Sequence, residues 1–178
     1  MVRVFRIFVV MTLLLVAFAT PAVAAHEGPI KGTVMGEHGP PDFTAPGCPE
    51  WAEWRYSSAG EGRMSHLGRV EYSLTQCTVP GPVTTSEGTI TFVAANGDEL
   101  WIAHTMFSQL VGPLEHPDGF LFEGEWTAVG GTGRFTNAAG SGDLHGAGNV
   151  YGVVDPDVPE GLMQLNIEGK IAYDRSGK

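Results

Sequence analysis

The residues whose types suit chemistry are six histidines, two cysteines and a pair of acids on a strand-like segment. None of the histidines pairs with another at the His-x-His or His-x-x-x-His spacing of local metal sites; they are His26, His38, His66, His104, His116 and His145. A zinc site assembled from distant segments is the alternative. Local spacing therefore predicts no metal and no other cofactor.

Glu123 and Glu125 are the acids whose spacing suits acid–base catalysis. Two residues apart on a strand, their carboxylates share one face at a separation of about 7 Å. However, Phe120, Phe122 and Trp126 alternate with them and mark the opposite face as the buried one. We expect the two acids to face solvent. The chain also lacks the Gly-x-Ser-x-Gly segment that carries a nucleophilic serine.

Cys48 and Cys77 are the only cysteines, 29 positions apart. A catalytic or metal-binding thiol lacks support because there is no Cys-x-x-Cys. A disulfide is expected if the chain is exported, because thiols outside the cytosol meet oxidants. In the chain-entropy account, closing a loop of this length stabilises the fold by about 3–4 kcal/mol.

The N-terminus indicates export. Arg3 and Arg6 precede an apolar run over 7–19, and small residues follow up to Ala24 and Ala25, which is the order of a cleavable signal peptide over residues 1–24. A membrane anchor is the alternative, but the run is about 13 residues and a span needs roughly 20. We expect a secreted or envelope protein with no membrane span in the mature chain.

Charge and size limit the function classes. The formal net charge is −10, and loss of two leader arginines makes it −12 for the mature chain. Nucleic acids and anionic membranes require a basic face, so neither is an expected partner. Residues 25–178 have the size of a single domain.

The elements that must position these residues are β-strands. The chain holds 25 glycines and 12 prolines, and no helical period follows residue 25. A long loop, a candidate lid, is expected over 37–62. Asn96-Gly97 predicts a two-residue hairpin turn. Period-two alternation and turn signals predict strands at 26–36, 67–75, 88–95, 98–106, 120–128, 142–147, 150–154 and 163–173, with a short strand at Arg134-Phe135. This pattern fits an antiparallel sandwich or a barrel equally well.

The glycine-rich stretch 130–142 suggests phosphate binding at first sight. Its spacing is wrong for a dinucleotide fingerprint, because Thr136 stands where the last glycine belongs, and it opens strands rather than a helix. Glycines that permit tight turns and close strand crossings explain the same residues.

That stretch, Gly130-Gly-Thr-Gly-Arg-Phe-Thr-Asn-Ala-Ala-Gly-Ser-Gly142, resembles the allene oxide cyclase barrel superfamily, which includes the dirigent proteins. Supporting segments are 88–92, 95–98, 65–69 and 168–173, which together look like exported bacterial members of the same group. The resemblance implies an all-β fold: a single closed antiparallel eight-stranded barrel, related in shape to lipocalins (calycin-like), with an apolar lumen.

The resemblance also frames the function. Known activities in the superfamily orient or cyclise apolar intermediates, which needs few charged groups. We expect a barrel that binds a small apolar ligand or acts through its surface; a cyclase- or dirigent-like enzyme is the alternative, and the oligomeric state is open. His104 shares the alternation of its strand's apolar residues and is expected to be a hydrogen-bonded core histidine; a catalytic histidine is the alternative. The side chains predicted to line the lumen, as ligand contacts or as plain core, are Tyr72, Phe92, Ile102 (or its neighbour Trp101), His104, Phe122, Trp126 and Leu165.

Overall fold

The computed structural model describes residues 26–79, 81, 83–112, 119–149 and 161–174. The predicted leader and the predicted strand at 150–154 lie outside these residues. The elements are β1 (His26–His38), β2 (Trp54–Met64), β3 (Gly68–Val79), β4 (Thr84–Ala94), β5 (Glu99–Val111), β6 (Gly119–Gly131), the 3₁₀ helix η1 (Gly133–Phe135), β7 (Ala139–Gly148) and β8 (Gly161–Tyr173).

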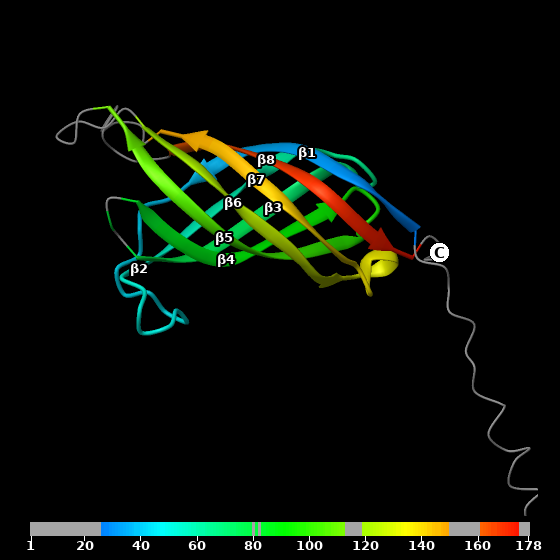
Figure 1. The fold of residues 1–178 in the computed structure, drawn as a ribbon, viewed down its shortest axis with the longest axis horizontal. Helices are drawn as coiled ribbons and strands as arrows, with labels where there is room; N and C mark the ends of the chain where they lie inside the picture. Colours follow the sequence, from blue (N-terminus) through cyan, green and yellow to red (C-terminus); the bar gives the residue numbers. More distant parts are fainter. Residues whose placement is uncertain (1–25, 80, 82, 113–118, 150–160, 175–178) are drawn as a thin grey trace, which may run out of the picture.

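The strands form a closed antiparallel barrel in chain order. Each strand pairs with the next, and β8 returns to β1 from His26↔Tyr173 to His38↔Gly161. The expected eight-stranded barrel is therefore confirmed. We call the end at which β1, β3, β5 and β7 finish the mouth end. The other, the plugged end, carries η1 and the end of β8, whereas the segment between β1 and β2 lies at the mouth end (Figure 1).

Along each strand, buried residues that face the barrel interior alternate with residues that face solvent. On β6, Phe122 and Trp126 are buried and Glu123 and Glu125 are exposed, as expected. Removing such side chains from water is the main stabilising contribution, about 1.5–3 kcal/mol for each large apolar group. On β5 the inward residue is Ile102, and Trp101 lies outside.

Inner glycines let the aromatic side chains fit. A Cβ at Gly146 would lie 2.4 Å from Phe122 Cζ, and one at Gly169 would lie 2.8 Å from Trp126 Cζ2. Gly146 pairs directly with Phe122 across β6 and β7. The ring therefore occupies space that any larger residue at position 146 would fill.

The glycine-rich motif closes the plugged end. Gly133 has φ +55°, and a Cβ there would lie 2.0 Å from Asp98 Oδ1. The resulting turn seats Phe135, which is fully buried, and pairs Arg134 with Asp98 at 3.2 Å. The prediction of a strand at Arg134-Phe135 was wrong, because these residues form η1.

Within the described ranges, no helix is long and apolar enough to cross a membrane.

Two further expectations need correction. The predicted loop 37–62 is too long, because β1 continues to His38 and β2 begins at Trp54. The signal for β2 was weak since its inner positions include Ser58, Gly60 and Gly62 rather than large apolar residues. The hairpin between β4 and β5 lies where Asn96-Gly97 indicated, but only Gly97 has positive φ, at +84°, and four residues separate the strands.

Candidate functional site: a cavity at the mouth end of the barrel

A cavity of about 310 Å³ lies inside the mouth end. Inward residues at the ends of the strands form most of its wall, and Pro41 from the segment between β1 and β2 completes it. The lining residues are His38, Pro41, Trp54, Tyr56, Gln76, Thr78, Thr84, Ser86, Met106, Ser108, Gln109, Leu110, Phe120, Phe122 and Met163. At about 30 Å³ per water-sized group, this volume holds a molecule of about ten non-hydrogen atoms.

The cavity wall is largely apolar and carries no formal charge. Within the described residues, its lining includes no Asp, Glu, Lys or Arg. Some of its polar groups bond one another: Thr78 Oγ1 and Ser86 Oγ are 3.0 Å apart, and His38 Nε2 lies 2.9 Å from the carbonyl oxygen of Asn149. A mostly apolar concave surface with a few polar groups is typical of small-molecule sites.

Besides Arg134 Nε, which is ion-paired with Asp98, three side chains among the described residues have buried polar atoms without a hydrogen-bond partner. They are Tyr56 at its hydroxyl, Gln76 at Oε1, and His104 at both ring nitrogens. Most buried polar groups in proteins are paired. His104 was expected to be a hydrogen-bonded core histidine; it is buried, but neither ring nitrogen bonds a group of the described residues.

Burial shifts the pKa values of two of these side chains, His104 and Tyr56. His104 is only 5% exposed, and desolvation lowers the pKa of its ring to about 4. Desolvation, followed by the effect of Tyr72, raises the pKa of the Tyr56 hydroxyl. His104 is therefore neutral and Tyr56 protonated at physiological pH.

All seven side chains predicted to line the lumen are buried within the barrel. Phe122 also lies on the cavity wall. Tyr72 bonds Ser58 at 2.8 Å between the two hydroxyl oxygens. The others pack in the barrel interior away from the cavity wall: Phe92, Ile102, His104, Trp126 and Leu165. Ligand contact by these residues stays a prediction.

Sequence reasoning missed most of the cavity wall. Tyr56 and Trp54 fell within the supposed loop. Gln76 and Thr78 could have been found from the sequence, because they continue the inward alternation of Tyr72 and Leu74 on β3. Small and polar inward residues at strand ends mark where a barrel is not filled by its own side chains.

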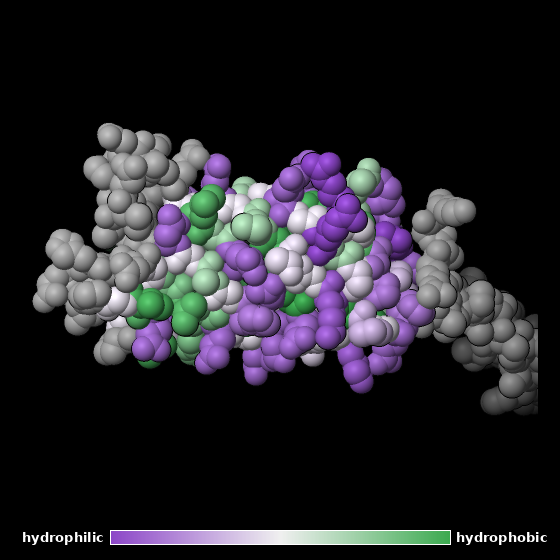
Figure 2. All heavy atoms as spheres, turned by 90° about the horizontal axis from the view of Figure 1, so that it is seen from above, coloured by the Kyte–Doolittle hydropathy of each residue, from purple (hydrophilic) through white to green (hydrophobic). Residues whose placement is uncertain are grey.

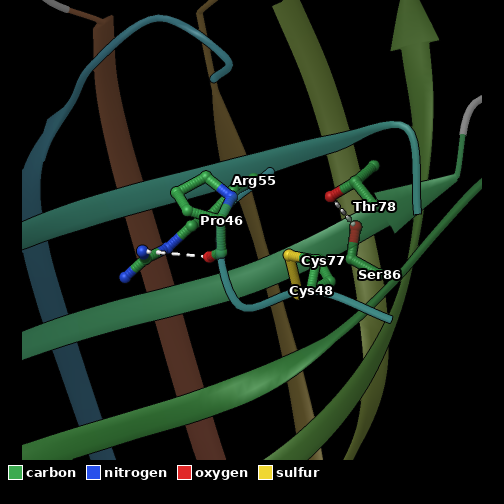
Figure 3. The surroundings of a disulfide bond; sticks show 6 residues. All are labelled: Pro46, Cys48, Arg55, Cys77, Thr78 and Ser86. Atoms are coloured by element: carbon green, nitrogen blue, oxygen red, sulfur yellow. Dashed lines mark hydrogen bonds between the residues drawn. A yellow bond between two sulfur atoms is a disulfide. The ribbon is translucent and has the colours of Figure 1, made fainter. Parts of the chain in front are cut away.

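The predicted disulfide joins Cys48 to Cys77 on β3 (Figure 3). It fastens the segment between β1 and β2 beside the cavity. Arg55 supports the same segment, since its Nη1 donates to the carbonyl oxygen of Pro46 at 3.4 Å. Asp42 and Arg55 also form an isolated β-bridge. The segment is thus held at several points, and its role as a lid stays a prediction.

The outer surface offers a second concave region, a groove of about 630 Å³ whose lining includes Val83, Phe107 and Leu121. Figure 2 shows hydrophobic residues gathered toward the mouth end of the visible face, with hydrophilic residues over the middle and the other end. Exposed apolar residues at the mouth end include Leu110 and Leu162. Among the described residues, no three His, Cys, Asp or Glu side chains gather as a metal site would require.

No family model matches this chain, and no curated protein matches it. The solved structure of a pterocarpan synthase dirigent protein is similar, with a TM-score of 0.41 and 13% identity over 86% of this chain and 88% of that chain. The barrel architecture rests on the strand pairing of this chain itself, and the synthase activity belongs to that protein.

Proposed function

We propose that this protein binds a small, largely apolar molecule in the cavity at the mouth end of its barrel. The observation that carries the proposal is a cavity of about 310 Å³ whose wall combines Phe120, Phe122, Met106 and Met163 with a few polar groups. An apolar ligand is favoured there because its transfer from water is favourable and buries no unpaired charge.

The disulfide supports a site of action outside the cytosol, where such bonds persist. Together with the expected leader, it supports an exported binding protein that meets its ligand in the cell envelope or the medium.

Binding is favoured over catalysis by the chemistry of the wall. A cyclase acting by general acid–base chemistry needs an ionisable group within hydrogen-bond reach of its substrate. The described wall offers His38, which bonds the carbonyl oxygen of Asn149, and hydroxyl and amide groups. Catalysis through shape alone is the second candidate, and turnover of a bound ligand would reveal it.

The test is calorimetric titration of the protein with 1-decanol, a neutral molecule of suitable size, together with a variant that blocks the cavity. Ser108→Trp places a large ring at a half-buried position of the wall. Ser141→Trp is the matched control, because Ser141 is exposed on the outer face of β7. We expect the wild type and the control to bind decanol alike and the blocked variant to bind at least tenfold more weakly. Equal binding by all three proteins would overturn the proposal.

Native mass spectrometry of protein purified from its own host would identify the natural ligand. We expect a co-purifying neutral molecule that the Ser108→Trp variant does not retain.

A further inference from the structure

The three unpartnered polar side chains lie in one row of the barrel. Across the strands, Tyr56 of β2 pairs with Gln76 of β3, Gln76 with Gly88 of β4, and Gly88 with His104 of β5. Tyr56 and Gln76 line the cavity, and His104 continues the row into the interior. The three side chains therefore share one row of inward positions.

Gly88 lets β3 and β4 pack closely within this row. A Cβ at that position would lie 2.1 Å from the carbonyl oxygen of Thr75 and 2.8 Å from Gln76 Cβ. No side chain therefore stands between Gln76 and His104, whose Cα atoms are about 10 Å apart across two strand spacings. Tyr56 and Gln76 pair directly across β2 and β3 and both line the cavity, so one polar group in the cavity can reach both of them.

The hydrogen-bonding capacity of the row defines its occupant. Gln76 Oε1 accepts, and the Tyr56 hydroxyl donates or accepts. An occupant that satisfies them must both donate and accept. The row and the described cavity wall also lack a formal charge to balance an ion, and a buried ion without a counter-charge is strongly disfavoured.

We infer that the Tyr56–Gln76 pair of this row selects a ligand with one uncharged group that both donates and accepts hydrogen bonds, a hydroxyl or a primary amide, and discriminates against carboxylates and ammonium groups. This inference rests on the proposed function and narrows its ligand class. The remainder of the ligand is apolar, as the rest of the wall requires.

Four probes of similar length test the inference by calorimetry at pH 7.4: 1-decanol, its isomer 1-methoxynonane, decanoate and decylammonium. The ether accepts a hydrogen bond but cannot donate one. We expect decanol to bind about tenfold more tightly than the ether, because the ether leaves acceptors of the row unpaired. The two ions should bind more weakly than decanol by at least the same factor.

Two variants localise the effect. Tyr56→Phe removes only the hydroxyl, and Gln76→Leu removes the amide; each should reduce the preference for decanol over the ether to about threefold or less. Gln164→Leu is the matched control, since this amide is exposed on the outer face of β8 and does not line the cavity. The control should keep the full tenfold preference.

The outcomes separate the two proposals. If neither decanol nor the ether binds to the wild type, the proposed function fails. If both bind equally, the function stands and this inference is overturned. A decanol preference that survives both Tyr56→Phe and Gln76→Leu would also overturn it, because the row would then hold water only. The wild-type comparison needs no variant to fold.

Discussion

His104 should make the stability of this protein depend on pH below the ordinary pKa of a histidine. Its ring lies inside the barrel, 5% exposed, with no bond at either nitrogen. Burial lowers its pKa to about 4, against about 6.5 in an unfolded chain. Below pH 6.5 the unfolded chain therefore takes up a proton that the folded barrel does not, and folding is disfavoured.

The size of the effect follows from this difference in pKa. The free energy of unfolding falls by about 1.4 kcal/mol for each pH unit below 6.5, until the folded ring itself protonates near pH 4. The total loss is about 3 kcal/mol, of which about 2 kcal/mol appears between pH 6.5 and pH 5.0. Above pH 6.5 both states hold a neutral ring, and His104 adds no pH dependence.

The assay is urea unfolding, followed by tryptophan fluorescence, at pH values from 7.5 to 4.5 for the wild type and His104→Leu. Every other titrating group is common to both proteins, so the difference between the two curves isolates His104. We expect the variant to be as stable as the wild type or more stable at pH 7.5, because it removes unpaired buried nitrogens. It should gain about 2 kcal/mol relative to the wild type by pH 5.0. A difference that does not change with pH would refute the assignment of a buried neutral ring.

Two further changes test the disulfide and the inner glycines. Replacing Cys48 and Cys77 by alanine should lower the free energy of unfolding by about 3.6 kcal/mol in the chain-entropy account of this loop; loss of less than about 1 kcal/mol in urea unfolding would show that other contacts hold the segment. Gly146→Ala should destabilise the barrel by about 1–3 kcal/mol or more, because its Cβ would overlap the Phe122 ring and a backbone oxygen. Gly39→Ala, where nothing lies within 4 Å, should be neutral, and equal melting temperatures for the two variants would contradict this packing.

The strand faces could be predicted from the sequence where large residues alternate with polar ones. On β6, Phe122 and Trp126 against Glu123 and Glu125 sufficed, because burial of every second residue is a local property. β2 escaped detection for the opposite reason. A Cβ at Gly60, on its inner face, would lie 2.1 Å from the carbonyl oxygen of Met35, so close packing of strands there demands the very residue that gives no hydrophobic signal.

Closure of the barrel and the position of the cavity depend on pairing between distant segments. Alternation alone fitted a sandwich as well as a barrel, and the pairing of β1 with β8 decides between them. In the same way, His104 and Gln76 are 28 positions apart and meet in one row only through the register of β3, β4 and β5. Their unpaired atoms could not be foreseen from either residue's own neighbours.

The most direct test of the central claim is where a bound ligand lies, and methionine methyl groups report it. Met106 and Met163 line the cavity, Met64 is buried toward the plugged end, and Met35 is exposed on the outside. In ¹³C-methyl-methionine NMR spectra, titration with 1-decanol should shift the methyl signals of Met106 and Met163 and give intermolecular NOEs to them, leaving Met35 and Met64 unchanged. Binding without any effect on Met106 and Met163, or shifts confined to Met35, would contradict a ligand site inside the mouth end of the barrel.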